Sequence, residues 1–66
     1  MEKIFKKAID FISYQKKGLR EVFIKKYGIE NYYHILNLGL IEETYAQGQP
    51  SWVRTQEVKK MRNFYV

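Results

Sequence analysis

The sequence predicts a small α+β domain that is mostly helical, with three helices, a two-stranded hairpin and a final helix. Two patterns support this fold class. Apolar residues recur at spacings of three and four between Ile4 and Leu38, which is typical of amphipathic helices. The strand-forming residues that follow are divided by Gln47-Gly48-Gln49-Pro50, a composition typical of a hairpin tip. Because the 66 residues contain neither a repeat nor a linker tract, one domain is expected over residues 1–66.

The first helix is expected over residues 2–15. One face combines mostly apolar residues at helical spacing, and the other face is charged. The core-facing set is Ile4, Phe5, Ala8, Ile9, Phe11, Ile12 and Gln15. The charged face carries Lys3, Lys6, Lys7 and Asp10. Lys16 and Lys17 suit the negative end of the helix dipole, and Gly18 permits a turn.

Two further helices are expected on either side of Gly28. The earlier one spans residues 19–26, with Leu19, Val22, Phe23 and Ile24 as its core candidates. The later one begins near Ile29 and Glu30, and Gly39 ends it because glycine adopts the left-handed conformation easily. Its inward positions are Tyr32, Ile35 and Leu36, joined by Leu38 or Ile29. Its opposite face carries Asn31, Tyr33, His34 and Asn37.

The hairpin is expected to consist of strands over residues 40–46 and 51–54, with residues 47–50 as its tip. Trp52 and Tyr45 are predicted to pack the hairpin on the helices. Thr55 is a favourable cap for a final helix. The apolar stripe of that helix comprises Val58, Met61, and Phe64 or Tyr65.

Charge favours a phosphate-bearing partner. Twelve Lys and Arg against seven Asp and Glu give a formal charge of +5 and a pI near 9.6. The cations are unevenly distributed, because residues 27–53 contain no Lys or Arg. The cluster that precedes this segment is Lys16, Lys17, Arg20, Lys25 and Lys26. A phosphate-facing edge is therefore expected at that cluster.

The order of these elements resembles the winged helix-turn-helix family of DNA-binding proteins. Three segments carry the resemblance: Leu38-Gly39-Leu40-Ile41-Glu42-Glu43, the tip Gln47 to Pro50, and Val53-Arg54-Thr55-Gln56-Glu57-Val58. The last is similar to the strand-to-helix junction after the wing in many regulators. Arg54 departs from the family pattern, which usually has an aliphatic residue there.

The resemblance implies a transcription regulator that binds double-stranded DNA. The exposed face of the third helix would enter the major groove, where asparagine can pair with adenine and tyrosine can contact thymine. The implied base contacts are Asn31, Tyr33, His34 and Asn37. The implied phosphate contacts are Lys16, Lys17, Arg20, Lys25 and Lys26. The implied wing residues are Gln47, Gln49 and Arg54.

Other functions receive less support. There is no cysteine, and the lone His34 has no second ligand at metal spacing, so neither a metal nor a cofactor is expected. No catalytic set or phosphate-binding glycine loop is present, which argues against an enzyme. No small-molecule effector is evident. No apolar run approaches the roughly 18 residues that a membrane span needs, so a soluble cytoplasmic protein without a membrane partner is expected.

A homodimer is expected because such a small core gains from association. Its interface is placed at the first helix and at the terminal stripe with Met61, Phe64 and Tyr65. The alternative hypothesis is a winged-helix protein-interaction adaptor, since the third helix carries no Lys or Arg. RNA binding is a third hypothesis, although the sequence has no aromatic sheet platform.

Overall fold

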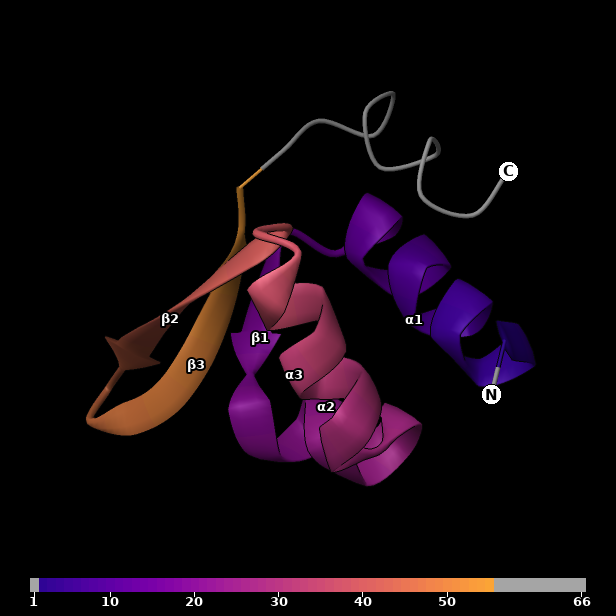
Figure 1. Cartoon of the computed structure of the whole chain (residues 1–66). Coiled ribbons are helices and arrows are strands. Elements are labelled where there is room, and N and C mark those ends of the chain that lie inside the picture. The colour runs from indigo at the N-terminus through magenta and orange to yellow at the C-terminus, as the bar shows by residue number, and fades with distance from the viewer. Residues whose placement is uncertain (1, 56–66) are drawn as a thin grey trace.

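The computed structural model describes residues 2–55 as three helices and one antiparallel sheet (Figure 1). The expected final helix, and with it Met61, Phe64 and Tyr65, lies outside the described residues. The helices are α1 (Glu2–Tyr14), α2 (Arg20–Tyr27) and α3 (Ile29–Asn37). The strands are β1 (Lys17–Leu19), β2 (Ile41–Ala46) and β3 (Gln49–Arg54), arranged in the order β1-β3-β2. The α+β class predicted from the sequence is confirmed.

Helix α1 follows the predicted amphipathic pattern. Ala8, Ile9 and Ile12 are fully buried, whereas Lys3, Lys6, Lys7 and Asp10 are exposed. The core prediction is wrong for Ile4, which is 49% exposed, and for the exposed Gln15. Both residues lie near the ends of the helix, where fewer neighbouring elements cover them.

Strand β1 was not predicted, and its formation overturns the expected turn at residues 16–18. Gly18 pairs with Trp52 of β3, and Lys17 and Leu19 pair with Val53 and Ser51. A Cβ atom on Gly18 would lie 3.2 Å from the Trp52 ring and 3.0 Å from the Gln15 amide nitrogen. Glycine is therefore needed at this position for close packing under an indole ring, and three residues are too few for a periodic strand signal.

Helices α2 and α3 meet at Gly28, whose φ of 93° is strained for any residue with a side chain. Phe23, Tyr32 and Ile35 point into the core as expected. Three expected core residues are instead exposed: Val22 at 53%, Ile29 at 53% and Leu38 at 37%. Each lies on a helix face that no described element covers.

Strands β2 and β3 pair over six residues without a bulge, from Ile41 opposite Arg54 to Ala46 opposite Gln49. Gln47 (φ 55°) and Gly48 (φ 79°) alone form the turn, with the two positive φ angles of a type I′ hairpin. The expected four-residue tip is therefore wrong, since Gln49 and Pro50 belong to β3. Pro50 is tolerated because β1 ends opposite Ser51, so no strand needs the missing amide.

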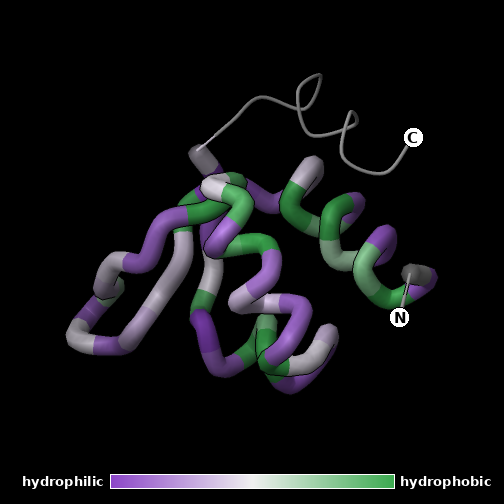
Figure 2. Tube along the Cα trace, in the orientation of Figure 1, coloured by the Kyte–Doolittle hydropathy of each residue, from purple (hydrophilic) through white to green (hydrophobic). Residues whose placement is uncertain are grey.

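The core lies between the three helices and one face of the sheet. Trp52 is 1% exposed, and its ring centroid lies 5.8 Å from that of Phe11 and 5.5 Å from that of Phe23. The prediction that Trp52 packs on the helices is confirmed. The same prediction is wrong for Tyr45, which is 74% exposed near the tip of the hairpin. The distal hairpin is largely hydrophilic or neutral in Figure 2, whereas hydrophobic residues gather in the helices and at the base of the sheet.

None of the helices within residues 2–55 is long and apolar enough to cross a membrane.

Candidate nucleic-acid interface

The outer face of α3 is accessible and carries most of the residues expected to contact bases. Tyr33 is 40% exposed, and His34 and Asn37 are also exposed. Their arrangement follows from the helical period, because Tyr32 and Ile35 occupy the buried side of the same two turns. The structure therefore places Tyr33, His34 and Asn37 together on one accessible helix face.

Asn31 differs from these three residues. Its side chain is partly buried, and its Nδ2 donates a hydrogen bond of 2.8 Å to the backbone carbonyl of Tyr27. The expectation that Asn31 lies on the exposed face is therefore wrong. Its amide satisfies a carbonyl at the C-terminal end of α2, which leaves one hydrogen-bonding donor fewer for a ligand.

His34 connects α3 to α1. Its ring stacks on Phe5 with the ring centroids 4.6 Å apart and an interplanar angle of 26°. The contact fixes one face of the imidazole while the residue remains exposed overall. It also brings the amino-terminal half of α1, with its lysines, to the side of α3.

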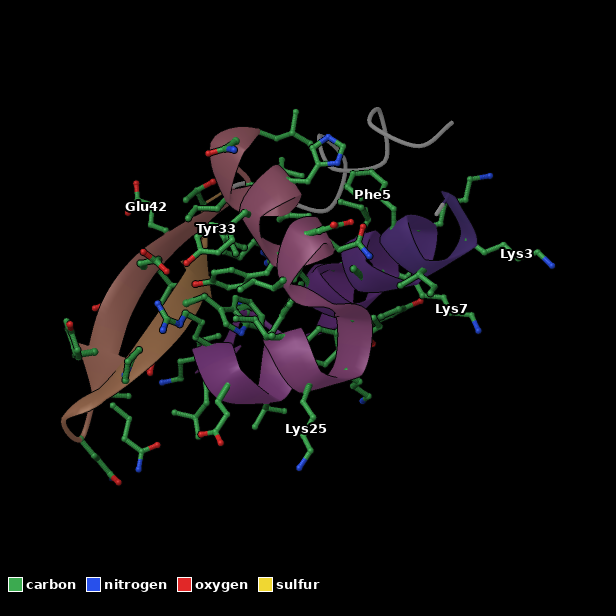
Figure 3. All side chains as sticks on the ribbon, turned by 60° about the horizontal axis from the view of Figure 1, so that its bottom comes forward. Lys3, Phe5, Lys7, Lys25, Tyr33 and Glu42 are labelled. Carbon is green, nitrogen blue, oxygen red and sulfur yellow. The ribbon has the colours of Figure 1, made fainter. Side chains whose placement is uncertain are left out.

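The lysines of α1 form a basic border that the sequence interpretation did not assign to the site. Figure 3 shows Lys3 and Lys7 projecting from α1 on one side of α3, with Lys25 of α2 below. Glu42 projects from β2 on the opposite side. The Phe5–His34 contact turns the apolar face of α1 toward α3, and Lys3 and Lys7 project from the opposite face of α1.

The five residues expected to hold phosphates do not form a single cluster. Lys16 and Lys17 precede α2 and are exposed, whereas Lys25 and Lys26 occupy its last turn. The Lys26 ammonium lies over the Phe11 ring, 5.2 Å from its centroid, and 5.9 Å from that of Tyr27. This cation–π contact occupies Lys26 within the protein. The cations of residues 16–26 are therefore distributed along α2.

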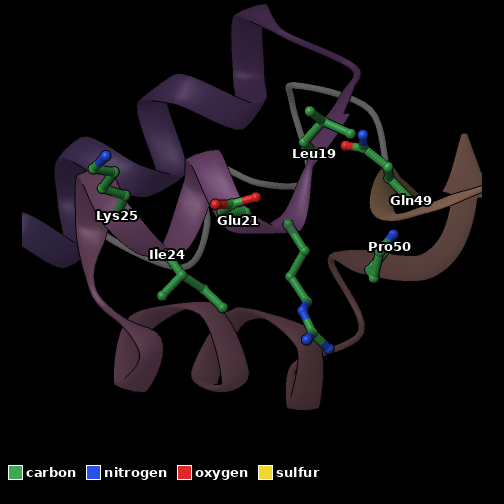
Figure 4. Close-up of a pocket in the computed structure, with 7 residues that line it drawn as sticks. Leu19, Glu21, Ile24, Lys25, Gln49 and Pro50 are labelled. Carbon is green, nitrogen blue, oxygen red and sulfur yellow. The ribbon is translucent and has the colours of Figure 1, made fainter.

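A shallow groove of about 560 Å³ separates α2 from the hairpin (Figure 4). Glu21, Ile24 and Lys25 line it from α2, and Gln49 and Pro50 line it from β3. Arg20 and Leu19 complete the lining at the start of α2. The groove thus combines apolar walls with cations at both ends of the helix.

Arg20 is paired with a carboxylate of the hairpin. Its Nη1 lies 3.6 Å from Oε2 of Glu43, and Tyr32 Oη donates a 2.9 Å hydrogen bond to the same oxygen. Burial, together with the hydrogen bond to Glu43, raises the pKa of Tyr32 far above its ordinary value of 10.0. Burial also raises the pKa of Tyr27. Both phenols remain protonated donors at neutral pH.

The three residues expected in a wing lie at different ends of the hairpin. Gln47 and Gln49 are exposed at and beside the turn. Arg54 lies at the base of the hairpin, where Nη1 donates hydrogen bonds to the backbone carbonyls of Ile12 (3.1 Å) and Ser13 (2.8 Å). An arginine suits this position because its guanidinium satisfies carbonyls at the C-terminal end of α1.

Thr55 occupies the end of the described chain. Its hydroxyl donates a hydrogen bond to the carbonyl of Gly39, and its amide donates to the carbonyl of Leu40 at 2.9 Å. Thr55 thus secures the chain after β3 to the loop between α3 and β2.

Within residues 2–55, no three His, Cys, Asp or Glu side chains are grouped closely enough to hold a metal ion.

Neither a protein-family model, nor a curated protein, nor a solved structure matches this chain.

Proposed function

We propose that this chain is a winged-helix protein that binds double-stranded DNA and regulates transcription, with α3 entering the major groove. The observation that carries the proposal is the division of α3 into a buried face and an accessible face with Tyr33, His34 and Asn37. The sheet order β1-β3-β2 and the hairpin directly after α3 support a winged-helix layout. An α-helix with one free face has the dimensions that the major groove admits.

Base reading is assigned chiefly to Asn37 and Tyr33. The Asn37 amide presents a donor and an acceptor that match adenine, and the Tyr33 ring and hydroxyl suit a thymine methyl group or a phosphate. His34 contributes through the ring edges, since one ring face stacks on Phe5. Asn31 supports the turn before α3 through its bond to Tyr27.

Phosphate affinity is assigned to both sides of α3. Lys25 projects from α2 on one side of it, and Lys3 and Lys7 project from α1, which packs against α3 through Phe5. Arg20, Lys16 and Lys17 extend the basic region toward the start of α2. Such contacts fix the register of a protein on DNA without reading its sequence.

Fluorescence anisotropy with a mixed-sequence duplex at low and at physiological salt tests the proposal. Binding is expected at low salt and should weaken steeply as salt rises, by about 0.9 in log-log slope for each phosphate contact. Exchange of Lys17 and Arg20 to Ala is expected to weaken it. Absence of binding at low salt, or binding unchanged by the double substitution, would overturn the proposal.

A second candidate function, a protein-interaction adaptor, is favoured by the apolar side chains exposed on and beside α3. Ile29 is 53% exposed, Tyr33 40% and Leu38 37%, and residues 27–53 contain no cation. A defined partner that remains bound after nuclease treatment, together with feeble duplex binding, would favour the adaptor over the DNA-binding protein.

Homodimerisation is part of the proposal and is checked by light scattering. A two-fold dimer would present two α3 helices to half-sites roughly 34 Å apart, one turn of the double helix. A monomer at concentrations that saturate DNA would contradict this part of the proposal.

A further inference from the structure

The Arg20–Glu43 pair lies where three elements meet. Arg20 is the first residue of α2, Glu43 lies on β2, and Tyr32 projects from α3. Glu43 is paired in register with Trp52, whose ring contacts Phe23, so both side chains lie on the helix-facing side of the sheet. The cation expected to hold a phosphate therefore faces a carboxylate of the same chain.

The pair is built so that it can separate. The Arg20 and Glu43 side chains are 39% and 42% exposed, so neither charge is left buried when the other moves. The 3.6 Å separation exceeds a hydrogen-bond distance, and an exposed pair of this kind contributes only about 0–1 kcal/mol. Tyr32 donates its own hydrogen bond of 2.9 Å to Glu43, so this carboxylate has a donor besides Arg20.

We propose that Glu43 is an internal substitute for phosphate on Arg20 and thereby lowers the affinity of the protein for DNA of any sequence. A guanidinium binds carboxylates and phosphates with the same planar set of donors, so one anion replaces the other. After the exchange, Tyr32 holds the Glu43 carboxylate near the bound phosphate, where like charges repel. Because a phosphate contact carries no sequence information, the effect weakens binding to all duplexes alike.

This inference rests on the proposed DNA-binding function and concerns the strength of nonspecific binding. Because Glu43 weakens the phosphate contact of Arg20, base contacts of the exposed α3 face supply a larger share of the binding free energy. Where the DNA backbone does not place a phosphate within reach of Arg20, Arg20 pairs with Glu43 again.

The chain offers a matched control for Glu43. Glu42 is its neighbour on β2, carries the same charge and is exposed, but it points to the opposite face of the sheet. Exchange of either residue to Gln removes one negative charge. Only Glu43→Gln removes the anion that faces Arg20, and its amide oxygen still accepts from Tyr32.

The test is fluorescence anisotropy with a mixed-sequence duplex at about 0.1 M salt, where the Debye length is roughly 10 Å. Glu43→Gln is expected to tighten binding about three- to fivefold, and Glu42→Gln less than about twofold. In an Arg20→Gln background, the gain from Glu43→Gln should shrink to that from Glu42→Gln. Equal gains from the two glutamates, or a gain that persists without Arg20, would overturn the inference.

A second measurement uses the unsubstituted protein and is therefore independent of any folding defect in a variant. Carbon-13 detection of the side-chain carboxyls follows Glu43 and Glu42 as duplex is added. The Glu43 signal is expected to move as Arg20 leaves, with a smaller change at Glu42. A Glu43 signal that stays in place while α3 amides shift would contradict the exchange.

The two experiments also separate this inference from the function on which it rests. If neither the parent chain nor Glu43→Gln binds duplex at low salt, the DNA-binding proposal fails, and the inference fails with it. If the parent binds and the two glutamate variants behave alike, only the inference fails.

Discussion

The two halves of the described chain differ sharply in charge. Residues 2–26 contain eight Lys and Arg and three Asp and Glu, whereas residues 27–55 contain one cation, Arg54, and three glutamates. The first half provides α1 and α2, and the second provides α3 and the hairpin. In the proposed function, the phosphate contacts and the side chains that select among bases therefore come from different segments.

The fold brings the two halves together at α3. Phe5 of α1 stacks on His34, and Arg20 of α2 faces Glu43 of β2. The acidic half therefore touches the basic half at the site where a ligand would bind. The net charge of +5 therefore overstates the positive potential near α3, because a carboxylate such as Glu43 neutralises part of the positive charge locally.

Trp52 is the residue of the hairpin that most strongly joins the two halves. Its exchange to Ala removes contacts with Phe11 and Phe23 and is expected to cost about 3–5 kcal/mol, enough to unfold a domain of this size. Thermal denaturation followed by circular dichroism checks this. Tyr45→Ala, at a hairpin position that is 74% exposed, is the control and should change stability by less than about 0.5 kcal/mol. A cooperative transition near the parent temperature for Trp52→Ala would refute the prediction.

The lysines of α1 were not among the expected phosphate contacts, and their exchange tests whether they contribute to DNA affinity. Joint exchange of Lys3, Lys6 and Lys7 to Gln is expected to lower duplex affinity about tenfold and to reduce the salt slope by about 0.9 per lost contact. Glutamine retains helix propensity, so α1 should remain folded. The comparison variant exchanges Gln47 and Gln49, the residues expected at the tip of a wing, to Ala and should lower affinity less, because it removes no positive charge. An equal loss in both variants would assign the phosphate contacts to the hairpin as much as to α1.

The protonation of Tyr32 makes the free energy of unfolding depend on pH. Burial and the bond to Glu43 raise the pKa of Tyr32 above its ordinary value of 10.0, so the unfolded chain loses this proton first. Its contribution to stability is complete below pH 10.0 and should fall by about 1.4 kcal/mol per unit above it. Urea denaturation of the parent and Tyr32→Phe at several alkaline pH values measures the difference. A difference that does not decrease with rising pH would contradict the pKa shift.

The two asparagines of α3 have different expected roles: Asn31 stabilises the turn before the helix, and Asn37 contacts a base. Asn31→Ala removes the 2.8 Å bond to the Tyr27 carbonyl and is expected to cost about 1 kcal/mol of stability. Asn37→Ala should leave stability unchanged and weaken preference for the favoured duplex by about 1–3 kcal/mol. Denaturation curves and binding to selected and mixed duplexes check both variants. Reversal of the two effects would show that Asn31 is the reading residue.

The turn between β2 and β3 depends on its backbone conformation. A Cβ on Gly48 would meet nothing within 4 Å, yet φ is +79°. Gly48→Ala is therefore expected to cost about 1 kcal/mol through strain. Gln47→Asn should stabilise the turn slightly, because asparagine tolerates positive φ better than glutamine. Chemical denaturation compares the three proteins, and a neutral Gly48→Ala would contradict the type I′ geometry.

Periodicity predicted the helices and the hairpin well, because their apolar residues recur over enough positions to define a face. Tyr32 and Ile35 were assigned to the core from helical spacing, Trp52 was expected to pack the hairpin on the helices as a large aromatic residue, and all three are buried. Strand β1 escaped prediction because three residues define no period, and its existence depends on pairing with β3 more than 30 positions away. The exposure of Tyr45, Val22 and Leu38 likewise depends on which elements cover them.

The candidate site also contains some residues that the sequence predicts and some contacts that only the fold creates. Tyr33, His34 and Asn37 could be selected from the sequence because they share the polar face of one helix. The partners of Asn31, Arg20 and Arg54 could not, since each forms its contact with an atom of another element.

The sequence by itself determined the helical periodicity, the turn chemistry and the uneven distribution of charge, because these are properties of neighbouring residues. Only the tertiary structure decided which cations border α3, which are occupied within the protein, and that Glu43 rather than Glu42 faces Arg20. Those outcomes depend on strand pairing and helix packing, which bring together residues that are far apart in the sequence.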